Sequence, residues 1–243
     1  MSLFRDHVAI VTGAGGGIGK AIARSLGGEH GATVCLVGRT RAKLEAARQE
    51  LGPGAPSAVV LPTDLTIDAQ MDTLVHTVER DLGGTDILVL CAGEIAEGPI
   101  REVPVEEMDR LYRSNVRANY RLVRALLHML KKRPGQIAFI NSSSGLGPRP
   151  NVSQFSATQH ALRAFADALR AEVNSDGIRV LSVYPGRTAT PRQEALYQTR
   201  RSGYQPDLLL QPEDVASVVV NALALPPTAE VTDISIRPRV KSY

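Results

Sequence analysis

A glycine-rich segment near the amino terminus constrains the fold more than any other feature. Residues 7–11 (HVAIV) have the length and the branched side chains of a buried strand, and they lead directly into TGAGGGIG at residues 12–19. The following KAIARSLG has a helical pattern. Glycines permit a turn that side chains would obstruct, and they let the N–H groups at a helix start approach an anion. The segment therefore predicts a strand, a tight turn and a helix that together bind a phosphate group.

Short apolar runs recur along the rest of the chain and alternate with longer helical patterns. Such alternation is typical of parallel βαβ units, in which right-handed helical crossovers join the strands. The chain is predicted to be one α/β domain, a doubly wound Rossmann fold with a seven-stranded parallel sheet and helices on both faces. The predicted strands are residues 7–11, 33–37, 58–61, 87–90, 136–140, 179–183 and 231–236, and the two long helices are 105–131 and 152–175.

The predicted domain spans residues 1–243 and divides by role. Residues 1–140 are expected to bind mainly the dinucleotide. Residues 141–243 are expected to hold the active-site positions, a lid at 187–210 and the C-terminal strand. The lid is predicted because a polar stretch bearing Arg and Tyr interrupts the alternation after a strand, where active-site loops are common.

Composition limits the classes of partner. A net charge of +3 spread along the chain and 4% aromatic residues offer neither a cationic surface nor a stacking platform for nucleic acid. We expect a cytoplasmic protein without a membrane segment, because the chain has neither a leader pattern nor a sufficiently long apolar stretch. Cys35 and Cys91 lie in apolar runs and are predicted to be buried strand thiols, so neither a disulfide framework nor a metal site is expected.

Several landmarks occur in a fixed order along the whole chain. The first turn fits T-G-x-x-x-G-x-G, and it does not fit the general six-residue dinucleotide fingerprint, because Ile18 stands where the last glycine would be. Later landmarks are Asp64-Leu65, Cys91-Ala92-Gly93, Asn115, Ser142-Ser143-Ser144-Gly145 and Pro185-Gly186. With these features the chain resembles the classical short-chain dehydrogenase/reductase family of NAD(P)-dependent oxidoreductases.

The resemblance implies a set of cofactor-binding residues. Asp64 is expected to contact the adenine amino group and Leu65 the adenine ring, while four residues after the sixth strand surround the nicotinamide carboxamide. The complete predicted set is Gly13, Gly17, Ile18, Gly19, Arg39, Thr40, Asp64, Leu65, Ala92, Gly93, Pro185, Gly186, Thr188 and Thr190.

The residues after the second strand indicate which cofactor is preferred. An acidic residue about 20 positions beyond the glycines binds the ribose 2′-OH of NAD. Here Gly38 and Arg39 occupy that region, and a guanidinium can pair with a 2′-phosphate and stack on adenine. NADP(H) is therefore favoured over NAD(H). The alternative interpretation of Arg39 is a solvated charge at a helix start.

The resemblance also locates the catalytic positions, and it shows departures there. Family members have a Tyr that transfers the proton, a Lys four residues later that lowers the Tyr pKa, a Ser that orients the carbonyl and an Asn that completes the relay through water. Residues 155–162 read FSATQHAL, so Phe155 and Gln159 stand at the Tyr and Lys positions. Ser142, 13 residues before Phe155, and Asn115 match the Ser and Asn, and Cys91 stands where an Asn is usual. Without a phenol and an ammonium group the usual relay cannot operate.

Other residues could take over the proton transfer. The candidates are Tyr184, Glu94, His160, Tyr197 and Tyr204, and a structural role is the alternative for each. Ser142 has the alternative of a loop hydroxyl, and Asn115 that of a partner for the backbone at a helix bend. His160 is the weakest candidate, because it points about 100° away from the helix face that carries Phe155 and Gln159.

Two main functions remain open from the sequence. The first is an NADP(H)-dependent oxidoreductase of a small carbonyl or alcohol substrate with an atypical or impaired proton relay. The second is a catalytically inactive NADP(H)-binding module, such as a sensor or a partner subunit, and redox-neutral chemistry in the same pocket is a third. The long helices resemble those that pair across subunits in the family, so a homodimer or homotetramer is predicted.

Overall fold

The computed structural model describes residues 3–52, 58–200 and 203–240. Seven strands form one parallel sheet in the order β3-β2-β1-β4-β5-β6-β7, which confirms the predicted fold class. The strands are β1 (Val8–Thr12), β2 (Thr33–Gly38), β3 (Ala58–Pro62), β4 (Ile87–Leu90), β5 (Gln136–Ile140), β6 (Arg179–Pro185) and β7 (Asp233–Ile236). The edge strand β7 begins two residues later than predicted, because its pairing with β6 starts at Ser182 and Asp233.

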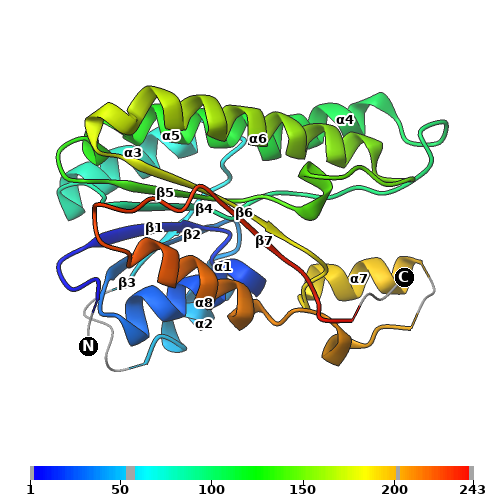
Figure 1. The fold of residues 1–243 in the computed structure, drawn as a ribbon, viewed down its shortest axis with the longest axis horizontal. Coiled ribbons are helices and arrows are strands. Elements are labelled where there is room, and N and C mark those ends of the chain that lie inside the picture. Colours follow the sequence, from blue (N-terminus) through cyan, green and yellow to red (C-terminus); the bar gives the residue numbers. More distant parts are fainter. Residues whose placement is uncertain (1–2, 53–57, 201–202, 241–243) are drawn as a thin grey trace.

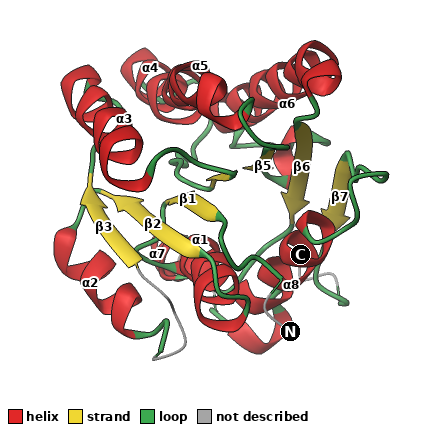
Figure 2. Cartoon of the chain, turned by 90° about the vertical axis from the view of Figure 1, so that its left-hand side faces the viewer, coloured by secondary structure: helices red, strands yellow, loops and turns green. Residues whose placement is uncertain are grey.

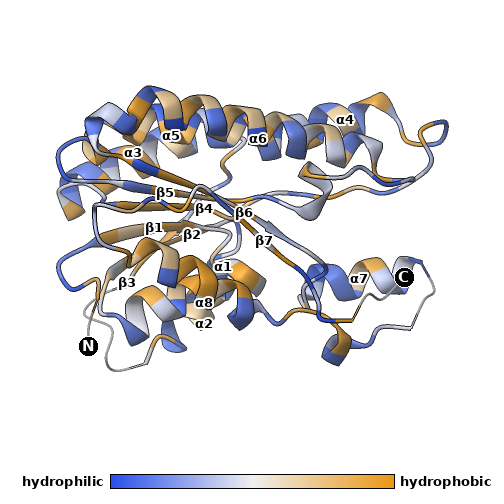
Figure 3. Cartoon of the chain, viewed as in Figure 1, coloured by the Kyte–Doolittle hydropathy of each residue, from blue (hydrophilic) through white to orange (hydrophobic). Residues whose placement is uncertain are grey.

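Helices cover both faces of the sheet, as Figures 1 and 2 show. One face carries α1 (Gly17–Arg24), α2 (Arg41–Gln49) and α8 (Pro212–Leu223), and the other carries α3 (Asp68–Leu82), α5 (Ala118–Leu130) and α6 (Ser153–Val173). Successive residues of β1 point to opposite faces of the sheet. Val11 lies in the core that contains α1, and Ile10 lies in the core that contains α5. Because both faces are covered, the central strands are apolar along their length (Figure 3).

The first of the two predicted long helices is not continuous. A π-helical turn at Arg113–Arg117 separates α4 (Val105–Tyr112) from α5. The side chain of Asn119 donates from Nδ2 to the carbonyl oxygen of Asn115 at 2.7 Å and so supports the widened turn. The prediction of one helix over 105–131 was therefore wrong. No proline or glycine marks the break in the sequence, so the sequence did not indicate it. The second helix, predicted over 152–175, is α6 followed by a single 3-10 turn at Asn174–Asp176.

The segment predicted as a lid forms a short helix beyond the carboxyl end of the sheet (Figure 1). It contains α7 (Pro191–Thr199) and a 3-10 turn at Pro206–Leu208, while residues 201–202 lie outside the described residues. Thr190 begins α7 by accepting a hydrogen bond from the backbone N–H of Gln193 at 3.2 Å. The two ends of the segment meet where the Ala189 N–H donates to the Leu210 carbonyl at 2.7 Å, so backbone pairing closes its base.

The two cysteines differ in position. Cys35 is fully buried in β2, as predicted. Cys91 lies just beyond β4 and is half-buried, so its prediction as a strand thiol was wrong. The strand ends there because the N–H of Cys91 donates to the side-chain Oγ1 of Thr12, at 2.9 Å, rather than to a backbone carbonyl of a neighbouring strand. Burial raises the thiol pKa to about 12 for Cys35 and to about 11 for Cys91, so both are protonated near neutral pH.

Candidate active site

The glycine-rich turn has the geometry that its sequence predicts. Gly13 and Gly17 adopt positive φ angles of 70° and 52°. A Cβ atom at Gly19 would lie 2.5 Å from the carbonyl oxygen of Gly13, so only glycine allows α1 to approach β1 this closely. No side chain among the described residues caps the start of α1, and the space around Gly16 is open. The first N–H groups of the helix are therefore available to a pyrophosphate.

Gly19→Ala is expected to destabilise the protein by about 1–3 kcal/mol, since its Cβ would press on backbone atoms that cannot rotate away. Gly16→Ala is the matched control: its site is open and its φ of 175° suits any residue, so its effect should stay within about 0.5 kcal/mol. Urea unfolding followed by circular dichroism measures both changes. Equal midpoints for the two variants would refute the close-packing argument.

Thr12 joins the glycine turn to the end of β4. Its Oγ1 accepts hydrogen bonds from the N–H groups of Cys91, at 2.9 Å, and Ala92, at 3.0 Å, and donates to the Val89 carbonyl at 3.2 Å. These contacts hold Cys91 and Ala92 against Gly13 at the carboxyl edge, where the strand order reverses between β1 and β4. Thr12 belongs to the matched pattern, but the sequence analysis did not single it out.

The predicted adenine side lies at the ends of β2 and β3. Arg39 follows β2 and donates from Nη1 to Glu94 Oε1 at 2.8 Å, and Thr40 is the N-cap residue of α2. The Asp64 carboxylate accepts two hydrogen bonds from Thr66, one from its backbone N–H at 2.9 Å and one from its hydroxyl Oγ1 at 2.6 Å. Burial raises the pKa of Asp64, but these bonds and the charge of Arg39 outweigh it and lower that pKa overall. Arg39 therefore lies near an ionised Asp64, and Leu65 beside it is buried.

The segment after β6 lies against the glycine turn. Thr188 is buried and donates from Oγ1 to the Gly186 carbonyl at 3.1 Å, and Gly186 N–H donates to Ile236 at 2.8 Å. The methyl group of Thr190 packs so closely on Gly17 that a Cβ there would lie 2.9 Å from it. The structure thus places Thr190 against the first turn, while Pro185 is the last residue of β6.

Arg192 is a candidate cofactor residue that the sequence analysis missed. From α7 its Nη2 donates to the carbonyl oxygen of Gly93 at 2.6 Å. Burial of its guanidinium lowers the pKa of Arg192, and the positive charge of Arg39 acts in the same direction. Arg192 binds Gly93 and Arg39 binds the adjacent Glu94, so two guanidinium groups approach the same loop at the carboxyl edge, where an anion could bind both. No sequence pattern marks Arg192, because it occurs in a lid segment without a recognisable signature.

The predicted catalytic positions on β5 and α6 are brought together. Ser142 follows β5, is half-buried and accepts at Oγ from the N–H of Ser144 at 3.1 Å. Asn141 accepts from the Ser142 N–H at 2.6 Å and donates from Nδ2 to the Gln159 carbonyl at 3.0 Å. Phe155 is half-buried one helical turn before the buried Gln159. These bonds fix the Ser142 loop against the α6 turn that carries Phe155 and Gln159.

Asn115 links three segments of the site. Its Oδ1 accepts from the Glu94 N–H at 2.7 Å, and its Nδ2 donates to the Glu94 carbonyl at 2.9 Å and to Thr158 Oγ1 at 3.1 Å. The amide thus holds the loop after β4 against α6. These contacts agree with the alternative interpretation of Asn115 as a partner for backbone groups beside the bend between α4 and α5.

The five possible replacement proton donors lie in different surroundings. Tyr184 is only 1% exposed, and its hydroxyl has no hydrogen-bond partner among the described residues. Glu94 pairs with Arg39 and Arg110, and His160 Nδ1 lies 2.9 Å from the Ser156 carbonyl. Tyr197 and Tyr204 pack against each other at the lid with ring centroids 5.5 Å apart. Tyr184 is thus removed from solvent, and the two lid tyrosines form one aromatic pair.

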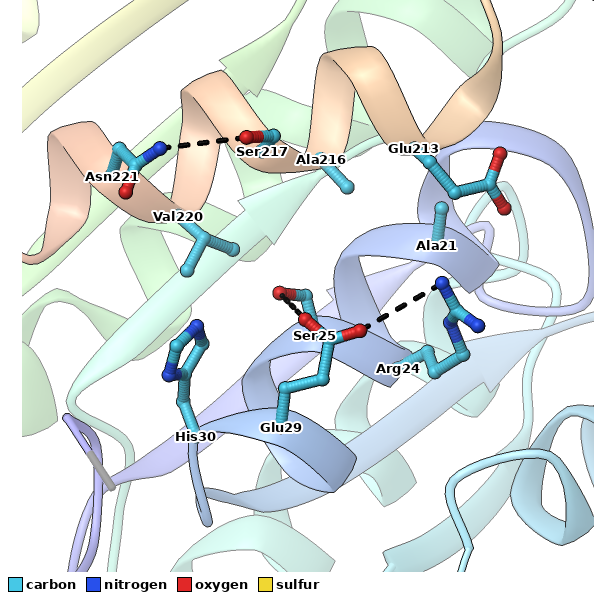
Figure 4. Close-up of a pocket in the computed structure, with 10 residues that line it drawn as sticks. All are labelled: Ala21, Arg24, Ser25, Glu29, His30, Glu213, Ala216, Ser217, Val220 and Asn221. Carbon is cyan, nitrogen blue, oxygen red and sulfur yellow. Dashed lines mark hydrogen bonds and ion pairs between the residues drawn. The ribbon is translucent and has the colours of Figure 1, made fainter. Parts of the chain in front are cut away.

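A separate pocket of about 150 Å³ lies between the end of α1 and α8, away from the glycine turn (Figure 4). Its polar side chains bond to one another: Ser25 donates to Glu29 at 2.8 Å, and Asn221 donates to Ser217 at 3.4 Å. We assign no role to this pocket.

The described residues contain no cluster of three or more His, Cys, Asp or Glu side chains suited to a metal ion. Within those residues, no helix is both long and apolar enough to cross a bilayer.

Comparison with known proteins agrees with this geometry. Residues 7–201 match the model of the family described as short chain dehydrogenase. An uncharacterised oxidoreductase of Staphylococcus aureus (strain USA300) is 34% identical over 239 residues, which cover 98% of this chain and 100% of the relative.

Solved structures are similar over nearly the whole chain. The 3-ketoacyl-(acyl-carrier-protein) reductase from Brucella melitensis, complexed with NADH, has a TM-score of 0.84 and 28% identity and covers 97% of this chain and 98% of its own. The alcohol dehydrogenase from the archaeon Thermococcus sibiricus, complexed with 5-hydroxy-NADP, has a TM-score of 0.88 and 25% identity, with 98% coverage of both chains. The chain described here therefore belongs to the short-chain dehydrogenase family of oxidoreductases.

Proposed function

We propose that the protein is an NADP(H)-dependent oxidoreductase of a small carbonyl or alcohol substrate whose proton relay differs from that of its family. The observation that carries the proposal is the carboxyl edge between β1 and β4, where an uncapped helix start lies near Arg39 and Arg192. An uncapped helix start and two guanidinium groups suit a phosphate-rich ligand. The similar structures hold NADH in one case and an NADP derivative in another, so the preference for NADP(H) rests on Arg39.

Different residues of the chain would bind different parts of the cofactor. The glycine turn and α1 would hold the pyrophosphate, Arg39 the 2′-phosphate, and Asp64 and Leu65 the adenine. Arg192, whose guanidinium lies beside Gly93 and near that of Arg39, would face the pyrophosphate, and Thr188 and Thr190 would fix the nicotinamide end. Gln159 can hydrogen-bond a ribose hydroxyl, although it lacks the charge of a lysine. When bound, NADPH supplies a hydride to the carbonyl carbon of the substrate.

The proton for the carbonyl oxygen needs a separate source. Ser142 can donate a hydrogen bond that orients this oxygen, but a serine hydroxyl is too weak an acid to replace a tyrosine activated by lysine. Phe155 contributes an apolar surface and no proton. We infer that the proton comes from water, and that the enzyme is therefore slow or acts on strongly electrophilic carbonyls.

The second candidate function is an inactive NADP(H)-binding module. The aromatic ring of Phe155 and the uncharged amide of Gln159 favour it, since both stand at positions where the family resemblance places proton-transfer groups. Calorimetric titration with NADPH, combined with an assay of NADPH oxidation on a panel of carbonyls, separates the candidates. Binding with turnover supports the oxidoreductase, binding without turnover supports the module, and absence of NADPH binding contradicts both.

We propose that the protein is a homo-oligomer that acts in the cytoplasm on a small molecule, without a nucleic-acid or membrane partner. Apolar or aromatic side chains remain exposed on the outer helix layer, among them Val105 and Tyr112 on α4 and Tyr120 on α5. Pairing of these helices across a two-fold axis would cover such side chains. Light scattering coupled to size exclusion should give the mass of a dimer or tetramer, and a monomer at assay concentration would contradict the assembly.

A further inference from the structure

Three arginines outside the set assigned to the cofactor lie near one another. Arg149 belongs to the loop after β5, Arg187 follows β6, and Arg200 follows α7. We call these residues the arginine cluster. Helix α7 and the loops after β4 and β5 lie at the carboxyl end of the sheet (Figure 1). Ligands of open parallel sheets bind at this end.

Direct contacts hold the cluster in place. Arg200 donates from Nε to Glu97 Oε2 at 2.7 Å and from Nη2 to Glu97 Oε1, and so joins the lid to the loop after β4. The guanidinium of Arg200 also lies 5.8 Å from the centre of the Tyr197 ring, and Arg187 donates from Nη1 to the Tyr197 hydroxyl at 3.3 Å. Tyr197 is therefore a common support for two of the arginines, and it is itself buried.

The loop that carries Arg149 is fixed to the same frame. The N–H of Gly98 donates to the Asn151 carbonyl at 2.8 Å, and Gln154 donates from Nε2 to the Ala96 carbonyl at 3.2 Å. These two bonds attach the Glu97 loop to Asn151 and to the first turn of α6. The chain on the C-terminal side of Arg149 is therefore held beside Glu97.

The charge of Arg149 is poorly compensated. Among the described residues no carboxylate lies within ion-pair distance of it. Arg149 is an exposed residue whose guanidinium is only partly desolvated; this desolvation first, and then the positive charges of Arg187 and Arg200, lower the pKa of Arg149, while Glu97 acts in the opposite direction. Glu97 also pairs with Arg200. An oxyanion beside Arg149 would relieve this repulsion and accept charge-assisted hydrogen bonds.

We propose that the arginine cluster binds an anionic group, a carboxylate or a phosphate, on the carbonyl substrate. This inference rests on the proposed function, because it assigns the cluster to the molecule that is reduced. It narrows the substrate class to carbonyl compounds that carry an acidic group at the end remote from the reacting carbonyl. Glu97 then limits the net charge of the cluster and positions Arg200.

A set of matched aldehydes tests the proposal without requiring turnover. 4-Formylbenzoate and 4-formylphenyl phosphate carry an oxyanion, and 4-formylbenzamide is a neutral compound of similar shape. Calorimetry with the NADP⁺-saturated protein should show at least one anionic aldehyde binding at least about 10-fold more tightly than the amide, the size of a charge-assisted contact. Equal affinities for all three compounds would overturn the assignment.

Substitutions test which residues cause the preference for the anionic aldehydes. Arg149→Gln and Arg187→Gln should each remove most of it, whereas Glu97→Gln should strengthen anion binding because it removes the opposing charge. Arg80→Gln, on the exposed surface of α3, is the matched control and should change nothing. A preference that survives both arginine substitutions would refute the role of the cluster. A protein that does not bind NADP⁺ or NADPH would refute the proposed function instead, and the same titration of the cofactor-free protein would still test the arginines.

Discussion

Replacing Phe155 with tyrosine and Gln159 with lysine in the same protein is expected to raise the rate of carbonyl reduction at least about 10²-fold, the lower end of what general acid catalysis contributes. The reason is that the double variant provides a phenol and a cation one helical turn apart, on the part of α6 that the Asn141 bond holds against the Ser142 loop. The cation is essential, because an unperturbed tyrosine pKa of about 10 limits proton exchange near neutral pH. Rates are compared at saturating NADPH with a reactive carbonyl.

The single variants are the controls for this gain. Phe155→Tyr alone lacks the field of the cation, and Gln159→Lys alone lacks a proton donor, so each should recover much less than the pair. Gln159 is only 5% exposed, so the new ammonium group requires a check of folding by circular dichroism. A folded double variant that binds NADPH and is as slow as the parent would show that the pocket has diverged elsewhere. A parent that is already fast would show that another group supplies the proton.

The second large effect concerns the choice of cofactor. NADPH is expected to bind more tightly than NADH, and Arg39→Ala should remove most of the difference, a loss of about 1.5–3 kcal/mol or about 10- to 150-fold in Kd. The ion pair of Arg39 with Glu94 does not prevent this contact. The Arg39 side chain is 66% exposed, and surface pairs of this kind contribute about 0–1 kcal/mol. A 2′-phosphate therefore competes successfully for the guanidinium.

Arg48→Ala provides a matched control for Arg39→Ala, since Arg48 is an exposed arginine at the far end of α2 that pairs with Glu45. It should leave both dissociation constants unchanged in calorimetric titrations. Equal affinities for NADPH and NADH in the parent would contradict the interpretation of Arg39. A similar loss in both arginine variants would assign the effect to net charge.

Local patterns were enough to predict the fold. Parallel strands covered on both faces must be continuously apolar, and β1, β2 and β4 are; the glycine turn then fixes where the first helix begins. The positive φ angle of Gly17 and the close approach at Gly19 both follow from the residue type. These features depend on neighbours in the chain and are therefore visible in one sequence.

The parts that sequence reasoning missed depend on contacts between distant residues. The π turn around Asn115 is supported by Asn119 and by contacts with Glu94 and Thr158, which no local periodicity reveals. Arg192 reaches Gly93 from a helix 99 positions away in the chain. The end of β4 was also not predictable from the sequence, because it is set by the bond between the Cys91 N–H and the Thr12 hydroxyl on another strand.

We propose that this chain transfers a hydride from NADPH although Phe155 and Gln159 stand where the family resemblance places a tyrosine and a lysine. The most direct measurement is the transfer of deuterium from NADPH labelled at C4 of the nicotinamide to an electrophilic carbonyl, with the unaltered protein and mass analysis of the product. We predict a labelled alcohol, formed at least about 10²-fold more slowly than with the double variant. Saturable NADPH binding with no label in any product of a broad carbonyl panel would contradict the claim and identify the protein as a binding module.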